Sequence, residues 1–284
     1  MPPHQQVAIV GVGLLGGSIG LALRERGLAA EIVGVGRHAE KLDRAAADGI
    51  IDRSETDLAT GIGEAEVVVV CTPVEVVATT IAEVARHAPA SCLVTDVAST
   101  KVTVVAEVES VLSQVPGETT FIGSHPLAGD HRSGAEFARA DLFAGKTVVV
   151  TPTTETSAGT VDRAAAFWQS LGAKVVQMSP EQHDAALAVT SHLPHLVASA
   201  LSLATTDNVS PLVATGWLDT TRVAAADAAL WRQIFASNRG QVLVAVEQFS
   251  EYLERLRTAL AHEDDAHLEQ LLAEGKRIRD AVGN

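Results

Sequence analysis

Two polar side chains lie directly after predicted strands, where they could take part in a proton transfer. Ser99 belongs to DVASTK, which follows the apolar stretch Cys92–Thr95, and His125 follows Phe121–Ser124. Ligands of open parallel sheets bind beyond the carboxyl ends of the strands, so both side chains would lie near the reactive part of a bound ligand. A neutral histidine there could take a hydroxyl proton as hydride leaves the same carbon, because its pKa lies near neutral pH. His125 could equally cap its strand by hydrogen bonding to a backbone carbonyl.

The elements that would place these side chains begin with a glycine-rich turn. Val7–Gly20, VAIVGVGLLGGSIG, predicts a strand, a tight turn and a helix, and its glycines follow the pattern G-x-G-x-x-G. Free N–H groups and the positive end of the helix dipole would face an anion there, which predicts that the turn holds the pyrophosphate of a dinucleotide. The cofactor contacts are assigned to Gly11, Gly13, Leu14, Leu15, Gly16 and to Thr72, the last residue of a later predicted strand.

The second predicted strand, Ile32–Val35, ends without the carboxylate that usually binds the ribose 2′-hydroxyl of NAD. Gly36, Arg37 and His38 stand there instead. Arg37 could pair with a 2′-phosphate through charge-assisted hydrogen bonds. We therefore expect NADP to be favoured over NAD, although Arg37 could also be a solvated loop residue.

Strand and helix patterns alternate from the glycine-rich turn to the apolar stretch Lys174–Met178. This alternation predicts an α/β fold with a doubly wound, Rossmann-like parallel sheet. Beyond Pro180 no strand pattern of any length occurs, and nearly everything to Asn284 has a helical pattern. We therefore divide the chain into a dinucleotide-binding domain, residues 1–180, and an all-helical substrate and dimerisation domain, residues 181–284.

The helical half contains an apolar seam that could join two copies of the chain. Apolar residues recur at spacings of four and three along one helix and continue in the next, which favours a homodimer, although the seam could also pack within its own domain. These residues are Val242, Val246, Phe249, Leu253, Leu256, Leu260, Leu268, Leu271, Ile278 and Val282.

Two further features of the helical half could bind a substrate. Arg222 lies in a mostly uncharged stretch and could bind a carboxylate through two hydrogen bonds, or pair with Asp219 or Asp227. His192 and His195 lie three residues apart in SHLPH, near a proline that begins or kinks their helix. Because a catalytic zinc needs a third protein ligand, we expect no metal here and prefer a substrate-facing or structural role.

Composition and charge exclude several classes of partner. The net charge is −14, which argues against nucleic acid or an anionic membrane as a partner. Val7–Leu23 is uncharged but contains five glycines, no Lys or Arg precedes it and no cleavage site follows, so we expect a cytoplasmic protein. Cys71 and Cys92 lie in predicted strands and are expected to be reduced core residues.

The chain resembles the prephenate and arogenate dehydrogenases of tyrosine biosynthesis over nearly its whole length. The resemblance rests on VGVGLLGGSIG, DVASTK, GSHPLAGDHRSG, LFAGKTVVVTP, MSPEQHD, SHLPH and TTRVAAADAALWRQIF, which occur in the family's order at comparable spacings. It implies oxidative decarboxylation of a cyclohexadienyl substrate: hydride passes to the nicotinamide, carbon dioxide leaves and the ring becomes aromatic.

The resemblance also implies roles for individual residues. His125 would be the base and Ser99 would support the same hydroxyl oxygen. Arg222 would bind a substrate carboxylate and His195 would help to place the substrate. Asp219 and Trp231 match positions near the pocket.

His131 departs from the family pattern, because several relatives carry a carboxylate at this point of the motif, where it bears on substrate entry and recognition. Loss of a carboxylate weakens attraction to an ammonium group, which favours prephenate over arogenate as substrate. A β-hydroxyacid dehydrogenase is the alternative enzyme, but such enzymes present a catalytic lysine on the helical domain, and no lysine lies between Lys174 and Lys276. A non-catalytic dinucleotide sensor is the third interpretation, and the presence of His125 and Arg222 argues against it.

Overall fold

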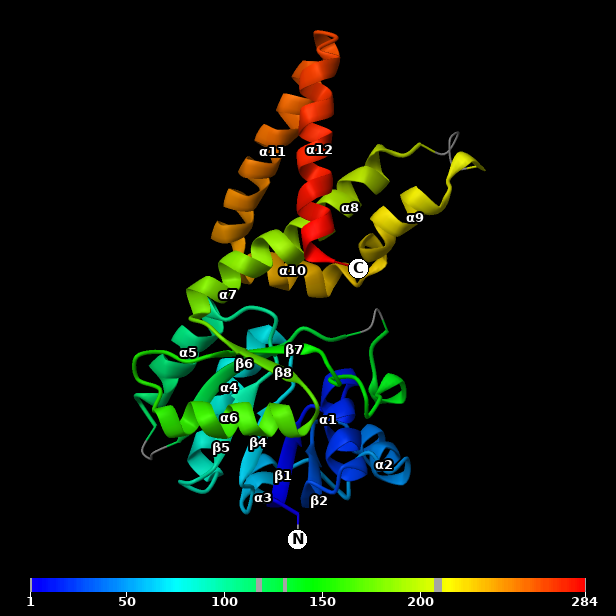
Figure 1. Ribbon diagram of the computed structural model, residues 1–284. Helices are drawn as coiled ribbons and strands as arrows, with labels where there is room; N and C mark the ends of the chain where they lie inside the picture. Colours follow the sequence, from blue (N-terminus) through cyan, green and yellow to red (C-terminus); the bar gives the residue numbers. More distant parts are fainter. Residues whose placement is uncertain (1, 116–118, 130–131, 207–210, 284) are drawn as a thin grey trace.

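An eight-stranded sheet with helices on both faces forms the first part of the molecule in the computed structural model, which describes residues 2–115, 119–129, 132–206 and 211–283 (Figure 1). The strand order is β3-β2-β1-β4-β5-β6-β7-β8. The strands are β1 (His4–Val10), β2 (Ala29–Val35), β3 (Arg53–Glu55), β4 (Val67–Val70), β5 (Leu93–Asp96), β6 (Thr120–Pro126), β7 (Thr147–Thr151) and β8 (Lys174–Gln177).

The sheet is parallel except between β6 and β7, so the doubly wound fold class is confirmed but an entirely parallel sheet is not. The chain turns back after β6, so that β7 begins at the same end of the sheet at which β6 finishes, and there the Leu127 N–H donates to the Thr147 carbonyl over 2.8 Å. A parallel β7 would have needed a crossover connection to the opposite end of the strands. β3 has no sequence signal, because its residues RSE are all polar, and it is defined only by its pairing with β2.

Alternating apolar residues of the strands supply one core on each face of the sheet. In β4, for example, Val67 and Val69 face one core while Val68 and Val70 face the other, as the two-residue period of a strand requires. Residues of α1 (Leu14–Glu25), α2 (Ala39–Ala47) and α6 (Ala158–Ser170) belong to the first core. Residues of α3 (Leu58–Ile62), α4 (Val77–His87) and α5 (Val102–Leu112) belong to the second, and two short 3-10 helices, η1 (Val74–Val76) and η2 (Ala135–Phe137), lie in the connections.

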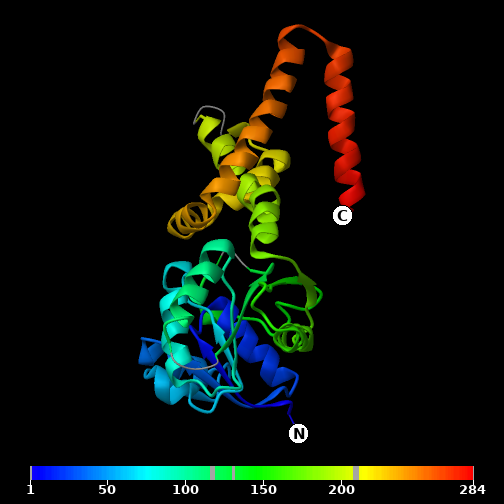
Figure 2. The same cartoon turned by 90° about the vertical axis from the view of Figure 1, so that its left-hand side faces the viewer.

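The described residues after β8 are helical. The elements are α7 (Pro180–Leu187), η3 (Ala188–His192), α8 (Leu193–Ala204), α9 (Thr215–Thr221), η5 (Arg222–Ala225), α10 (Ala228–Ser237), α11 (Arg239–Ala261) and α12 (Asp265–Val282). Helices α11 and α12 form an antiparallel hairpin that projects away from the sheet (Figure 2). None of the side chains of α12 is buried within this single chain, so its apolar residues lack the cover that a folded core would provide.

Helix α7 begins at Pro180 behind a complete capping box. The Ser179 hydroxyl accepts from the Gln182 N–H, and the Gln182 side chain accepts from the Ser179 N–H. The helix then continues through a π-helical turn, η3, into α8, whose second residue is Pro194. Among the described residues this continuous stretch, Pro180–Ala204, is long and apolar enough to span a membrane by length and composition alone. Its first turns instead carry buried polar groups that bond to the sheet half.

Candidate active site at the carboxyl edge of the sheet

The glycine-rich turn after β1 combines close backbone packing with one open position. Gly11 has φ +98°, and a Cβ there would lie 2.8 Å from the Cys71 carbonyl oxygen. A Cβ on Gly16 would lie 2.2 Å from the Gly11 carbonyl oxygen. At Gly13, by contrast, a Cβ would meet nothing within 4 Å. Gly11 and Gly16 are therefore required by packing, whereas Gly13 leaves space beside the helix that a ligand can use.

The chemistry of this turn fits the pyrophosphate of a dinucleotide. Helix α1 starts at Leu14 with no side-chain cap and no acidic residue in its first turn, so its first N–H groups remain available to an anion. The Thr72 hydroxyl, just beyond β4, is buried without a hydrogen-bond partner among the described residues. A buried hydroxyl normally has a partner, and a bound ligand would supply one.

The end of β2 carries Arg37, which is exposed and forms no ion pair or hydrogen bond within the described ranges. Lys41 and Arg44, on α2, line a cleft of about 440 Å³ together with Gly13 and residues 133–136. Asp48 and Glu136 line the same cleft, and Arg44 lies 3.7 Å from the Asp48 carboxylate, so the cleft carries both cationic and anionic side chains.

A buried ion pair ties the end of β5 to the end of β6. Lys101 has no exposed surface, and its ammonium group contacts the Asp96 carboxylate and donates to the Ser124 carbonyl over 2.7 Å. Asp96 also accepts from the N–H groups of Ala98 and Ser124. Burial lowers the pKa of Lys101, and the charge of Asp96 opposes this shift. The pair fixes the backbone immediately before His125.

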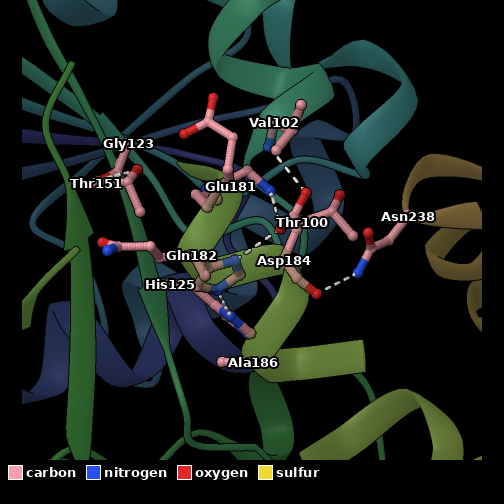
Figure 3. Close-up of polar contacts among 12 residues, drawn as sticks. Thr100, Val102, Gly123, His125, Thr151, Glu181, Gln182, Asp184, Ala186 and Asn238 are labelled. Carbon is pink, nitrogen blue, oxygen red and sulfur yellow. Dashed lines mark hydrogen bonds and ion pairs between the residues drawn. The ribbon is translucent and has the colours of Figure 1, made fainter. Parts of the chain in front are cut away.

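His125 is the last but one residue of β6 and is almost completely buried. Its Nδ1 lies 2.8 Å from Nε2 of His183, and Nδ1 of His183 lies 2.7 Å from Oδ1 of Asp184 (Figure 3). Burial lowers the pKa of His125 well below its usual value, with smaller contributions from the positive charges that His183 and Lys101 can carry. At neutral pH this imidazole is therefore neutral and able to accept a proton.

A second group of side chains lies in the helical half. The rings of His195 and Trp231 stack with centroids 3.3 Å apart, and His192 meets Trp231 edge to face. Burial, and next the charge of Arg222, lower the pKa of His195 to about 4, so His195 is neutral at neutral pH. Arg222 itself is exposed, and in the described ranges it pairs with neither Asp219 nor any other carboxylate.

The remaining predicted site residues form no hydrogen bond or ion pair with the groups described above, among the residues that the structure describes. Ser99 is half-buried in the turn after β5, and its hydroxyl forms no hydrogen bond to a described residue. Asp219 is exposed on α9, and Asp227 caps α10 by accepting from the Leu230 N–H. His131 lies outside the described residues.

Neither a metal site nor a disulfide is found in the ranges described. No group of three His, Cys, Asp or Glu side chains there could hold a metal ion. Cys71 and Cys92 are both free, and burial raises the pKa of each thiol.

The sequence singles out His125 but not the residues that contact it. His183 and Asp184 occur in MSPEQHD, directly after the change from strand to helix patterns, and both are completely buried. Buried polar residues are rare, but burial is invisible in the sequence here, because α7 has no apolar stripe that would show which face it buries. The ion-pair residue Lys101 is missed for the same reason, since lysine is ordinarily exposed.

Comparisons with known proteins match nearly the whole chain. Residues 19–177 match the family described as "Prephenate dehydrogenase, nucleotide-binding domain", and residues 179–274 match "Prephenate dehydrogenase, dimerization domain". A prephenate dehydrogenase of Bacillus subtilis is 34% identical over 97% of this chain and 76% of the relative.

Two solved structures share the fold over almost their full length. The prephenate dehydrogenase of A. aeolicus, in complex with hydroxyphenyl propionate and NAD+, has a TM-score of 0.89 and 33% identity, covering 98% of both chains. An arogenate dehydrogenase of Synechocystis has a TM-score of 0.85 and 28% identity, covering 98% of this chain and all of that one.

Proposed function

The chain belongs to the prephenate dehydrogenase family, and we propose that His125 is the base with which it oxidises its substrate. The protein is an NAD(P)-dependent oxidoreductase that converts prephenate to 4-hydroxyphenylpyruvate by oxidative decarboxylation, a step of tyrosine biosynthesis. When bound, the nicotinamide accepts hydride from the ring carbon that bears the hydroxyl.

The observation that carries the proposal is the position and protonation state of His125. It is a buried, neutral imidazole at the carboxyl end of β6, in the same sheet whose glycine turn suits a pyrophosphate. His125 takes the hydroxyl proton as hydride leaves the same carbon. Loss of carbon dioxide then returns an electron pair to that oxygen, which takes the proton back. The protein mainly orients substrate and cofactor and handles this one proton.

The helical half supplies the proposed substrate contacts. Arg222 has no carboxylate partner among the described residues and is close enough to influence His195, which supports a role in binding a substrate carboxylate. The stacked rings of His195 and Trp231 would bound the same space, and the neutral His195 would donate or accept a hydrogen bond. Ser99, Asp219 and His131 remain predicted site residues.

For the cofactor we infer a preference for NADP over NAD. The support is Arg37, which is exposed and unpaired two residues beyond β2, with Lys41 in the cleft beside the glycine turn. A 2′-phosphate could pair with Arg37, and residues 36–38, which directly follow β2, contain no carboxylate to repel it. The relative from A. aeolicus was solved with NAD+, so the two cofactors need direct comparison.

We also infer a homodimer formed through the helical half, which matches a dimerisation domain. Phe249, Leu253 and Leu260 of α11 and Ile278 and Val282 of α12 are all exposed in the single chain. A second copy that packs on these residues would bury them. A mass equal to one chain in light scattering at micromolar concentration would contradict this assembly. The cytoplasmic location and the absence of nucleic acid and membrane partners remain predictions.

The experiment that tests the proposed function is a set of four parallel assays. Prephenate or arogenate is offered with NAD or NADP, and the absorbance of the reduced nicotinamide is followed. We expect the highest kcat/KM with prephenate and NADP. Faster turnover of arogenate would reassign the substrate, and turnover with NAD at least as efficient as with NADP would remove the role given to Arg37. No turnover in any of the four would contradict the function itself.

A further inference from the structure

We propose that His183 and Asp184 are positioning residues that hold His125 in the one tautomer able to act as a base. The inference rests on the proposed role of His125. It concerns two neighbouring residues of α7: His183 contacts His125, and Asp184 contacts His183.

For an ionised Asp184 and a neutral His183, the state on which the proposal rests, hydrogen-bond complementarity determines every proton in this chain of side chains. An ionised carboxylate can only accept, so Nδ1 of His183, 2.7 Å from Oδ1 of Asp184, carries the hydrogen. In a neutral His183 the other ring nitrogen, Nε2, is then an acceptor. It lies 2.8 Å from Nδ1 of His125, which must therefore be the N–H. The lone pair of His125 is left on Nε2, the nitrogen that is free to accept the hydroxyl proton.

Hydrogen bonds to both carboxylate oxygens fix the orientation of the Asp184 side chain. Its Oδ1 also accepts from the Lys101 N–H over 2.8 Å, and its Oδ2 accepts from the Val102 N–H over 2.9 Å (Figure 3). The donors are the N-cap and the first residue of α5, at the end of the helix where the dipole favours a negative charge. The Asp184 carbonyl accepts from the Asn238 side chain over 2.8 Å. The carboxylate thus accepts from three N–H donors.

The same arrangement supports His125 when it carries the proton. The O–H bond of the substrate breaks as an N–H bond forms at Nε2 of His125, which makes the ring a cation in a site with almost no access to water. Its Nδ1–H still donates to His183, whose other nitrogen donates to the Asp184 carboxylate. The negative charge at the end of the chain offsets the new positive charge. The proton then returns to the substrate oxygen, so no further reactant is needed.

The tautomer can be measured directly in the whole protein without substrate. Histidine nitrogen resonances of protein labelled with ¹⁵N at histidine distinguish Nδ1–H from Nε2–H rings, and the His125 signals are identified by their absence from His125→Asn. We expect the Nδ1–H tautomer for both His125 and His183 in the native protein. An Nε2–H tautomer of His125 would overturn the proposal, and this holds whether or not any substrate is turned over.

Substitutions then test whether the pair affects turnover through His125. In Asp184→Asn the amide NH₂ replaces either Oδ1, where it meets His183 and the Lys101 N–H, or Oδ2, where it meets the Val102 N–H. In the first orientation both imidazoles reverse their tautomers. We expect the His125 signals to shift toward Nε2–H and kcat with prephenate to fall roughly 10²-fold, within the usual range for general-base catalysis. The affinity for the dinucleotide should stay unchanged. A native kcat with the His125 signals shifted to Nε2–H would overturn the proposal.

A control substitution at Glu181 and two substitutions at His183 distinguish the positioning role from a folding defect. Glu181→Gln removes the same charge from the same helix at an exposed side chain that bonds to Ser179, and kcat should not change. His183→Gln retains an oxygen that can accept from His125, whereas His183→Leu does not, so His183→Gln should retain more of the native kcat. Equal losses in these two variants, with equal melting temperatures, would contradict the assigned role. Absence of turnover by the native protein would instead contradict the proposed function and leave the tautomer measurement to decide the positioning role.

Discussion

Replacing Gly13 by alanine should weaken cofactor binding without weakening the fold. The backbone of Gly13 has φ −103° and ψ −150°, an extended conformation that alanine adopts, and the added Cβ would meet nothing within 4 Å. We therefore expect the free energy of unfolding to change by no more than about 0.5 kcal/mol. The methyl group would occupy the space that a pyrophosphate needs to approach the first N–H groups of α1. Loss of one charge-assisted hydrogen bond, about 1.5–3 kcal/mol, raises the dissociation constant roughly 10- to 150-fold.

Calorimetric titration with the dinucleotide and urea unfolding measure the two effects separately. Gly16→Ala is the contrasting variant, because its Cβ would lie 2.2 Å from the Gly11 carbonyl oxygen and 2.9 Å from the Ile9 side chain. That variant should lose roughly 1–3 kcal/mol of stability, as overpacked sites do. Gly216→Ala, on α9 and with nothing within 4 Å, should leave the dissociation constant unchanged and stabilise the fold by up to about 1 kcal/mol, as alanine does in place of an unstrained helical glycine. A native dissociation constant for Gly13→Ala would refute the assignment of this turn to the cofactor.

Three further outcomes are expected from the geometry of the site. Arg222→Ala should raise KM for prephenate roughly 10- to 150-fold, because the substrate carboxylate loses the cation that pairs with it. Arg232→Ala, which removes a surface ion-pair residue, should leave KM unchanged. Equal KM values for the two variants in steady-state assays would return Arg222 to a structural role. Lys101→Met should destabilise the protein by about 3–5 kcal/mol in urea unfolding because Asp96 is left buried without its cation, and an unchanged midpoint would show that the pair contributes nothing. Because burial lowers the pKa of His125, the base stays neutral as the pH falls through about 6.5, and kcat should decline only at more acidic pH; a decline centred at or above that pH would contradict the shift.

The local parts of this structure follow from the sequence because each depends on neighbouring residues. The glycine pattern, the apolar run before it and the helix after it lie within twenty residues, and the alternation of strand and helix predicts the sheet on which they sit. His125 is identified by the same reasoning, because ligands bind where parallel strands end.

What the sequence does not predict depends on contacts between distant segments. An apolar strand such as β7 has the same residue pattern in either direction, so its antiparallel pairing with β6 is set by the course of the preceding loop. His183 lies 58 residues from His125, on a helix whose docking position no local pattern specifies. Lys101 has the same residue type whether it is exposed or buried, and only the fold shows that it is paired with Asp96.

The central claim is that His125 is the base for oxidation of prephenate, and kcat of His125→Asn tests it most directly. Asparagine retains much of the size and removes the proton acceptor. At saturating prephenate and cofactor we expect kcat to fall roughly 10²–10⁴-fold, with the dinucleotide dissociation constant unchanged. Turnover at the native rate by His125→Asn would contradict the account and require a different base.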